Sequence, residues 1–467
     1  MDQVSAAEQM IRRFARQTNL LVAGRPALVR CVPGASDGVA RALERMLRDL
    51  GAPRGHAGDP GLVEYVLAAD AADSEILLEG AALPDRADGA ARIAFAGRHM
   101  PVSTEIASTL DVAGVRIGIA MVLEPKTAQL ALLLRDAGAE VAVYAHPDET
   151  DVAVADALRA EGVPVVADPT LSGAAEKQAA TDFLARGFDV FVDDGSHLIR
   201  LAHEVAPDLV DRWWGAAEET TSGLTPLRSM AARGLLRTGV MAVNDAQTKT
   251  RFDNRYGTGQ SCVFAIADLL DPLQITVRDQ PALVIGYGPV GEGVAAHLAA
   301  LGADVAVAEH DPVRALVARH DGYRVGDAAA LAEGALVVSA TGVRHTVTPD
   351  LLAAARIVAV AGGVPDEVDL SAGAHGALVL ADGGCINITA AEGNPIEIMD
   401  LSFAVQLSAI AHIVAERPAV GVHALPASVD ERVAKAALRR RDAEVVASHT
   451  DDTDDWRSTR YTREDAS

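Results

Sequence analysis

Short apolar runs alternate with long Ala-rich stretches through the middle of the chain. GVRIGIAMV is followed in turn by PKTAQLALLLRDAGA, EVAVYA, DVAVADALRAEG and VPVVAD. Such short apolar runs are typical of strands, and the longer Ala-rich stretches are typical of helices. The order therefore predicts repeated strand–helix–strand units, which build parallel sheets.

A second series of the same kind begins with PALVIGYGPVGEGVAAHLAALGADVAVAEHDP and continues through GALVVSATG and RIVAVAGG. Its strands are continuously apolar, as expected when helices cover both faces of a sheet. The two series predict an α/β fold with two doubly wound parallel-sheet domains, over residues 86–258 and 259–415. Residues 1–85, with ALVRCVPG and DGVARALERMLRDLGA, predict a small N-terminal α/β extension.

Residues 416–467 form a C-terminal return segment and end in the polar tail ASHTDDTDDWRSTRYTREDAS, which is either disordered or an arm that docks elsewhere. The 467 residues, 49% of them hydrophobic, suffice for two or three domains with real cores. The net charge of −24, from 65 acidic against 41 basic residues, argues against a nucleic-acid partner and against an acidic membrane surface.

The cysteine content and the N-terminal sequence indicate the cellular compartment. The three cysteines, Cys31, Cys262 and Cys385, form no CxxC pair, so neither a disulfide framework nor a metal site is expected. The N-terminal residues lack a basic segment followed by an apolar run, and no stretch is expected to reach the roughly 18 apolar residues of a membrane span. We expect a soluble, cytoplasmic protein with no membrane association.

The motif GYGPVG places Gly286, Gly288 and Gly291 between the strand-like ALVI and the helix-like GVAAHLAALGA. Glycines in this context allow a tight turn and the close approach of a pyrophosphate to a helix N-terminus. Glu309 ends the next strand, where an acidic group accepts from ribose hydroxyls and repels a 2′-phosphate. The motif predicts NAD rather than NADP; the alternative is a glycine-rich turn without a ligand.

The segment VNDAQTKTRFDNRYGTGQS, residues 243–261, concentrates polar groups in an otherwise aliphatic chain. Lys249 and Asp253 are four residues apart, so on a helix they share one face. Taken alone, the pair could be a surface salt bridge of little energetic weight.

Three motifs set this segment in context: DDGSHL at residues 193–198, EETTSG at residues 218–223 and the GYGPVGEG turn. Together they resemble the S-adenosyl-L-homocysteine hydrolase family, whose members carry DDGGDL, EETTTG, NDxxTKxxFDNxYG and GYGxVGxG in this order. The resemblance extends over roughly residues 90–435 and includes GGCINITAAEGNP and LPASVDERVA.

In that family a tightly held NAD oxidises the ribose 3′-hydroxyl of the substrate, the 5′ thiol is eliminated, water adds and the sugar is reduced again. The resemblance implies that Lys249 is the base at the 3′-hydroxyl, for which its pKa must fall. It implies that Asp253 and Glu219 hold the sugar hydroxyls and that Asp194 acts near the 4′ and 5′ carbons. The implied cofactor contacts are Thr220, Thr221, Ser222, Asn254, Gly286, Gly288, Val290, Gly291, Glu309, Thr341, Gly342, Asn387, Arg457 and Tyr461.

Arg457 and Tyr461 match the spacing of a C-terminal Lys and Tyr that reach a neighbouring subunit's NAD in the family, so the resemblance also implies a homo-oligomer. Several pocket positions depart from the family. Val122, Gly363 and Asn394 stand where it has histidines, Val122 replacing one used in acid–base work at the 5′ carbon.

At the base-binding end, Glu124 replaces a Thr of the family, Thr127 is retained and Lys126 replaces an acceptor for the adenine amino group. An ammonium group offers no acceptor to an amine, so Lys126 suits a carbonyl or an anion, such as a 6-oxopurine, a pyrimidine or a phosphate. Asn394, Glu124, Lys126 and Thr127 are therefore the expected substrate contacts.

Two histidines could compensate for the missing ones. His197, three residues after Asp194, is a candidate acid–base group because histidine titrates near neutral pH, and the alternative is a structural or exposed side chain. His345 follows SATG in a loop that in the family comes near the cofactor.

Three functions remain open. The first is an NAD-dependent hydrolase of a nucleoside-type substrate, either S-adenosylhomocysteine or a modified analogue. The second is a redox epimerase or oxidase of a nucleoside. The third is an NAD-binding regulatory homologue without turnover, which the retained Asp194, Glu219, Lys249, Asp253 and Asn254 argue against because burying unused polar groups costs free energy.

Overall fold

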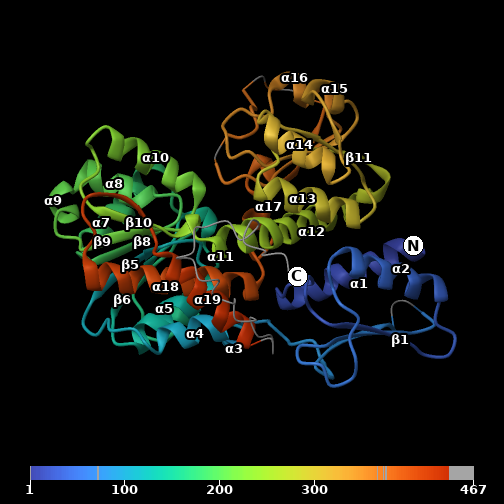
Figure 1. Cartoon of the computed structure of the whole chain (residues 1–467), viewed down its shortest axis with the longest axis horizontal. Coiled ribbons are helices and arrows are strands. Elements are labelled where there is room, and N and C mark those ends of the chain that lie inside the picture. Colours follow the sequence, from blue (N-terminus) through green and yellow to red (C-terminus); the bar gives the residue numbers. More distant parts are fainter. Residues whose placement is uncertain (1, 71–72, 365, 372, 374–375, 441–467) are drawn as a thin grey trace, which may run out of the picture.

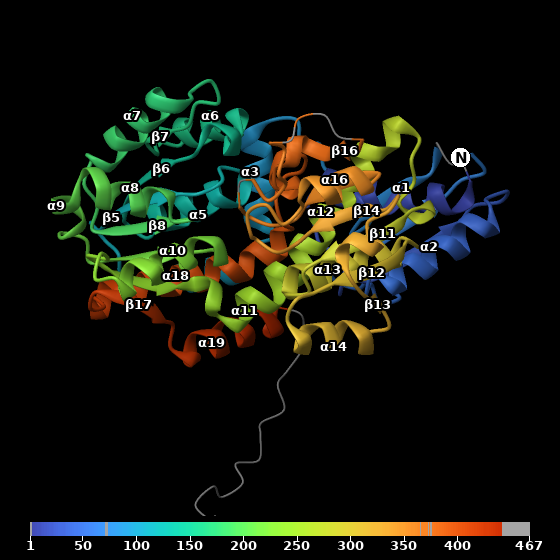
Figure 2. The same cartoon turned by 90° about the horizontal axis from the view of Figure 1, so that it is seen from above.

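Three sheets organise the computed structural model, which describes residues 2–70, 73–364, 366–371, 373 and 376–440. In Figure 1 the N-terminal extension (blue) lies beside two larger α/β lobes, one green to teal and one yellow to orange. Figure 2 shows helices on both faces of the sheets in these lobes. The expected α/β class with two parallel-sheet domains and a smaller extension is confirmed.

The N-terminal extension has a four-stranded sheet in the order β1-β2-β3-β4, in which only β1 and β2 are parallel. Its first helix is tied to the rest of the chain by the buried Arg12, whose guanidinium contacts Asp268 and lies 2.8 Å from a carboxylate oxygen of Asp271. The elements are β1 (Ala27–Cys31), β2 (Val63–Leu67), β3 (Glu75–Leu78), β4 (Ala81–Ala82), α1 (Gln3–Thr18) and α2 (Asp37–Asp49).

The first α/β domain has a seven-stranded parallel sheet in the order β17-β10-β9-β8-β5-β6-β7. The order reverses between β5 and β8, and ligands of doubly wound sheets bind outside the carboxyl ends of strands at such a point. The strands are β5 (Arg116–Ala120), β6 (Glu140–Tyr144), β7 (Val165–Val166), β8 (Val190–Asp193), β9 (Gly215–Glu218), β10 (Gly239–Ala242) and β17 (Gly421–Ala424). The helices are α3 (Gly89–Arg98), α4 (Pro101–Ala107), α5 (Pro125–Asp136), α6 (Val152–Ala160), α7 (Gly173–Leu184), α8 (His197–Val205), α9 (Pro207–Val210), α10 (Thr221–Ala232), α11 (Gln247–Lys249), α18 (Ile396–Glu416) and α19 (Ala427–Arg439).

The second α/β domain has a six-stranded parallel sheet in the order β13-β12-β11-β14-β15-β16, with its reversal between β11 and β14. The strands are β11 (Pro281–Ile285), β12 (Asp304–Ala308), β13 (Arg324–Val325), β14 (Leu336–Ser339), β15 (Ile357–Val360) and β16 (Leu378–Val379). The helices are α13 (Pro289–Ala300), α14 (Pro312–His320), α15 (Ala328–Leu331), α16 (Pro349–Ala354) and α17 (Ile386–Thr389).

A π-helix over Thr250–Gly257 continues into α12 (Thr258–Leu270) and joins the two α/β domains. Both pack against α13 through glycines. A Cβ on Gly259 would lie 2.7 Å from the backbone of Gly293, and a Cβ on Gly293 would lie 1.9 Å from the carbonyl oxygen of Arg255. Only glycine at these positions lets the polar segment touch the helix that follows the GYGPVG turn.

The chain returns to the first domain earlier than the expected boundary at residue 416. α18 packs against α4, α19 and β9, because its buried apolar side chains cover the first domain's sheet. The expectation that no segment is long and apolar enough to cross a membrane is wrong for α18, which meets both criteria. Most of α18 is buried inside the structure, as in the core helix of a globular domain.

Candidate active site

The carboxyl ends of β8 and β9 place two pairs of acidic residues side by side. Asp193 and Glu218 are register partners at the strand ends, and Asp194 and Glu219 follow them directly. The backbone N–H of Asp194 donates to the carbonyl of Ala120 on β5, so this group lies at the strand-order reversal. The sheet thereby assembles the DDGSHL and EETTSG motifs in one place.

Lys249 is the cation of this cluster and is 3% exposed. Its ammonium group lies 2.7 Å from a carboxylate oxygen of Asp253 and donates to the side-chain oxygens of Asn254 at 3.1 Å and Asn244 at 3.4 Å. Burial opposes the charge, but Asp253, Glu219 and Asp194 outweigh it and raise the pKa of Lys249. The expected fall of its pKa is therefore wrong for this state of the protein, because carboxylates surround the ammonium group.

Glu219 is 3% exposed, and neither of its carboxyl oxygens has a hydrogen-bond partner among the described residues. Burial, with a smaller contribution from Asp253 and Asp194, raises its pKa well above the ordinary range despite Lys249. Burial likewise raises the pKa of Asp194, against the opposing effects of Lys249 and His146. An unpartnered buried carboxyl costs free energy, so the two Glu219 oxygens are positioned to accept hydrogen bonds from a polar ligand.

Asn394 lies in the same cluster and ties it to the loop before α18. Its side-chain amide donates to Asp253 and, at 3.1 Å, to the hydroxyl of Thr258. Its oxygen accepts from Ser261 at 2.8 Å and from Asn387 at 3.1 Å. Asn394 thus orients Asp253, the ion-pair partner of Lys249, and the hydrogen bond from Asn387 orients Asn394 in turn.

Thr220, Thr221 and Ser222 of the EETTSG motif lie at the start of α10. The Thr220 hydroxyl donates to Glu218 at 2.7 Å and accepts from the N–H of Gly195 at 3.0 Å. A Cβ on Gly363, in the second domain, would lie 3.6 Å from the Ser222 hydroxyl, so this segment faces that domain. Thr221, also expected beside the cofactor, is exposed at the first position of α10.

Asp193 and Glu218 form a buried carboxyl pair that the sequence did not single out. Glu218 accepts from the backbone N–H groups of Gly195 at 3.0 Å and Thr220 at 2.9 Å, and Asp193 accepts from Ile199 at 2.7 Å. Burial raises the pKa of Asp193 to about 8, and burial together with Asp193 raises the pKa of Glu218 well above its ordinary value. This pair holds the two loops that carry Asp194 and Glu219.

In the first α/β domain Glu124 also caps α5, accepting from the backbone N–H groups of Lys126 and Thr127. The Lys126 ammonium group is 1% exposed, lies 2.7 Å from Glu124 and donates to the carbonyl of Glu392 at 2.7 Å. The carbonyl of Glu392 also accepts from Asn19 at 2.8 Å.

The carboxylate of Glu392 connects this end to the N-terminal extension. It contacts Arg86 and lies 2.8 Å from Arg92, and together with Lys126 these cations lower its pKa against the effect of burial. Because Asn19 also contacts Glu392, the extension supports the loop that binds Lys126. No local sequence signal indicates this role of Glu392.

The glycine turn follows β11. Gly286 has a φ of +93°, and a Cβ on Gly291 would lie 2.0 Å from the Gly286 carbonyl oxygen, so both positions require glycine. Gly288 is the N-cap of α13, and Val290 lies in its first turn. The Glu309 carboxylate lies beside this turn and accepts a hydrogen bond from the Tyr287 N–H at 2.6 Å. Burial tends to raise the pKa of Glu309, but hydrogen bonds from backbone N–H groups outweigh burial and lower it, so the carboxylate stays ionised. This geometry fits a dinucleotide whose ribose hydroxyls donate to Glu309.

Thr341 and Gly342 follow β14 at the reversal of the second sheet. The buried Glu367 holds them, accepting from the Thr341 N–H at 3.0 Å and hydroxyl at 2.9 Å and from the Gly342 N–H at 3.3 Å. Arg457 and Tyr461, also expected at the cofactor, lie outside the described residues.

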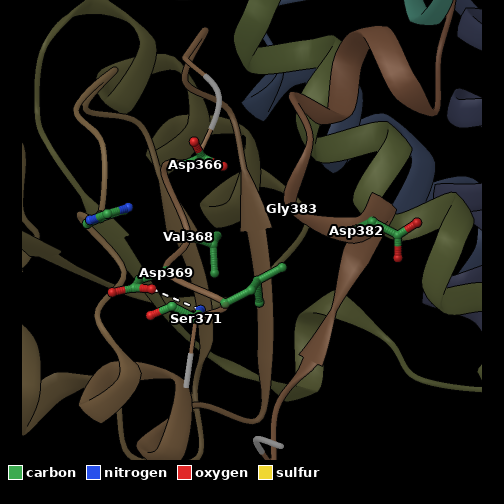
Figure 3. A pocket seen from close by; sticks show the side chains of 8 residues that line it. Asp366, Val368, Asp369, Ser371, Asp382 and Gly383 are labelled. Carbon is green, nitrogen blue, oxygen red and sulfur yellow. Dashed lines mark hydrogen bonds between the residues drawn. The ribbon is translucent and has the colours of Figure 1, made fainter. Parts of the chain in front are cut away.

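His345 lies apart from the acidic cluster of the first domain. It lines a cavity of about 200 Å³ in the second domain with Asp366, Asp369 and Asp382 (Figure 3). Asp369 there accepts from the N–H of Ser371 at 3.0 Å, shown as a dashed line. His345 itself has a φ of +56°.

A second set of titratable side chains flanks Asp194, and the sequence reasoning missed most of it. His146 follows β6, Glu176 lies in the first turn of α7, and Glu149 lies in the turn after His146. His197, which the sequence singled out, lies against this set: its ring centroid is 5.2 Å from that of His146. The alternation of strands and helices could have indicated His146. It follows the end of a strand, as Asp194 and Glu219 of the two acidic motifs follow the ends of theirs.

The sequence profile of the S-adenosyl-L-homocysteine hydrolase family matches residues 190–455. The S-inosyl-L-homocysteine hydrolase of Methanopyrus kandleri is 37% identical over 387 residues, which cover 76% of this chain and 90% of that protein. The adenosylhomocysteinase of Archaeoglobus fulgidus is 35% identical over 391 residues, covering 77% and 95%, respectively. The adenosylhomocysteinase of Thermococcus kodakarensis is 36% identical over 386 residues, covering 75% and 90%.

Proposed function

The chain belongs to the S-adenosyl-L-homocysteine hydrolase family, and on this basis we propose that it hydrolyses the thioether of an S-nucleosyl-L-homocysteine. NAD is the cofactor of this family. The observation that carries the proposal is the buried Glu219, whose two unpartnered oxygens lie in one cluster with Lys249 and Asp253. A ribose with vicinal hydroxyls supplies the donors that this carboxyl lacks.

The residues at the glycine turn fit the cofactor. Gly286, Gly288 and Gly291 would receive the pyrophosphate at the start of α13, and Glu309 would accept from the adenosine ribose. Asn254 and Ser222 would line the nicotinamide side, next to the sugar. When bound there, NAD supplies reversible removal of hydride from the 3′ carbon, which acidifies the neighbouring C4′–H.

Lys249 and the acidic residues would manage the protons. Asp253 and Glu219 bind the 2′- and 3′-hydroxyls and fix the sugar beside Lys249. A bound sugar would weaken the interaction of Lys249 with the carboxylates, and a positive charge nearby would lower the pKa of its ammonium group further. The ammonium group then loses a proton to solvent, and the neutral amine accepts the proton of the 3′-hydroxyl. Asp194, next to Lys249 at the end of β8, acts toward the 4′ and 5′ carbons.

Lys126 favours a 6-oxopurine as the base. Glu124 and the Glu392 carbonyl already accept hydrogen bonds from Lys126, Thr127 and Asn19, whereas the ammonium group has one further N–H to donate. An adenine amino group meets a donor at this position, and the carbonyl of hypoxanthine meets a partner. S-inosyl-L-homocysteine is therefore the proposed substrate, with S-adenosyl-L-homocysteine as the weaker one.

The test is to mix purified holoenzyme with S-inosyl- or S-adenosyl-L-homocysteine and to follow both the absorbance of reduced nicotinamide and free homocysteine. We expect reduction of the bound cofactor and thiol release, both faster with the inosyl compound. Reduction with no thiol released would instead favour a nucleoside epimerase or oxidase. A protein that binds NAD and shows neither signal would favour a regulatory homologue.

A further inference from the structure

An imidazole–carboxylate pair lies beside the acidic cluster and has no role in the function described so far. The Nδ1 atom of His146 is 3.0 Å from a carboxylate oxygen of Glu176, and the two side chains are 22% and 31% exposed. A carboxylate on one ring nitrogen fixes the orientation of an imidazole and leaves Nε2 for proton exchange. This partial exposure is compatible with access by substrate.

The sheet register places this imidazole at the reacting end of the sugar site. Ala120 at the end of β5 is the partner of both Tyr144 on β6 and Asp193 on β8. Val122 and His146 each lie two residues beyond these paired ends, and Asp194 lies one residue beyond its own. Because adjacent strands are about 4.8 Å apart, His146 and Asp194 flank Val122 across roughly 10 Å.

We propose that His146, oriented by Glu176, is the acid–base group at the 5′ carbon. The inference rests on the proposed function and deepens it. In the 3′-keto sugar Asp194 takes the C4′ proton, the electron pair left behind forms a C4′=C5′ double bond, and the C5′–S bond breaks. The His146 imidazolium gives its Nε2 proton to sulfur, and homocysteine leaves. Water then adds to C5′ of this double bond: the neutral imidazole takes a proton from the water as the C5′–O bond forms, and C4′ takes its proton back from Asp194. One water is consumed, its hydroxyl remaining on C5′ and its proton replacing the one given to sulfur.

Glu176 is the positioning residue in this scheme, because its carboxylate stabilises the imidazolium and holds its ring. Val122 contributes no polar atom between His146 and Asp194 and so leaves the proton exchange to His146. The backbone N–H of Leu123 donates to the Glu149 carbonyl at 2.9 Å, which fixes the turn after His146 against β5.

His197 is less suited to the role. Its Nδ1 atom is 3.4 Å from the Arg200 guanidinium rather than beside a carboxylate. Water reaches the ring, but the surrounding protein, His146 and Arg200 lower the pKa of His197 to about 4, so it carries no proton to donate at neutral pH. The other charged groups near the pair are Asp148 and Glu149 in the following turn, with Asp194 beyond β5; burial and Asp194 raise the pKa of Glu149 well above its ordinary value.

The test compares His146→Asn, Glu176→Gln, His197→Asn and Glu149→Gln holoenzymes, with His56→Asn in the N-terminal extension as a matched control, its side chain being 80% exposed. Each is mixed with the wild type's best S-nucleosyl-L-homocysteine. Reduced nicotinamide reports 3′ oxidation, and trapped homocysteine reports cleavage at C5′.

For His146→Asn we expect NAD reduction within a few-fold of wild type but thiol release slower by about 10²- to 10⁴-fold. In Glu176→Gln the imidazolium loses its counter-charge, so the pH profile of thiol release should move to lower pH, a change that a merely structural role would not produce. Retained reduction shows that each variant is folded and holds its cofactor.

Thiol release at the wild-type rate in His146→Asn, or its loss in His197→Asn or Glu149→Gln alone, overturns the assignment to His146 while leaving the proposed function in place. A wild-type holoenzyme that neither reduces NAD nor releases thiol overturns both.

Discussion

Asn394 donates a hydrogen bond to Asp253, and Asp253 lies 2.7 Å from the ammonium group of Lys249. The amide belongs to the loop before α18, and the ion pair belongs to the segment that joins the two α/β domains. The orientation of Lys249 therefore depends on a residue about 140 positions later in the chain than Asp253.

Replacing Asn394 tests this dependence. A hydrogen bond to a charged group contributes about 1.5–3 kcal/mol, so Asn394→Ala should slow NAD reduction by about 10- to 100-fold. Rapid-mixing absorbance of the reduced cofactor measures this step. Ser261→Ala removes only a donor to the Asn394 oxygen and should change the rate by a few-fold. Equal losses in the two variants would contradict a specific role for the Asn394–Asp253 contact.

Replacing Lys126 tests the choice of base. Lys126→Gln offers a carbonyl oxygen to an amine, so the ratio of kcat/KM for S-inosyl- over S-adenosyl-L-homocysteine should fall by at least about tenfold, the value of one hydrogen bond. Lys126→Arg keeps a charged donor and should retain the inosyl preference. An unchanged ratio in Lys126→Gln would show that another residue reads the base.

Glu219→Gln separates stability from function. Burying an acidic group without hydrogen bonds is costly, so the uncharged amide should leave the Tm of the ligand-free protein unchanged or higher. Reduction of NAD by substrate should fall by at least about 100-fold, because the sugar loses an acceptor at its hydroxyls. Glu161→Gln, on an exposed side chain, serves as the control. A large drop in Tm for Glu219→Gln would assign Glu219 to the fold instead.

The Asp193–Glu218 pair predicts a pH dependence of stability. Folding raises the pKa of Asp193 from about 4 to about 8, so the native state holds a proton that the unfolded chain has lost over this range. Its stabilising contribution is complete below pH 4 and is lost as the pH rises toward 8.

Thermal unfolding at several pH values checks this. Between pH 5.5 and 8.5 the Tm of the wild type should fall more than that of Asp193→Asn, which keeps an acceptor for the Ile199 N–H. Asp156→Asn makes the same chemical change at an exposed position of α6 and should follow the wild type. Parallel curves for Asp193→Asn and wild type would mean that this carboxyl does not hold a proton at neutral pH.

Local signals made much of the fold predictable. Both parallel sheets follow from short apolar runs between helical stretches, and the glycine turn before α13 follows from Gly286, Gly288 and Gly291 between a strand and a helix. α18 was harder to assign, because a continuously apolar helix carries no signal for which of two neighbouring sheets it will cover.

The site was only partly predictable for a physical reason. His146 and Asp194 meet because β5 lies between β6 and β8, and strand order is not written in the local pattern. The raised pKa of Lys249 depends on the sum of three carboxylates, two from the ends of β8 and β9 and one from the π-helix, which no single motif displays. Glu392 gains its role from Arg86 and Arg92, whose contacts with it are long-range.

The backbone contact between α12 and α13 has a mechanical consequence. Gly259 and Gly293 are too close for the two helices to slide or tilt freely against each other. Any change in the angle between the two α/β domains would therefore pivot at this contact, and the parts of each domain farthest from it would move most. Lys249 and the start of α13 lie near this contact, so the distance between them would change least in such a motion.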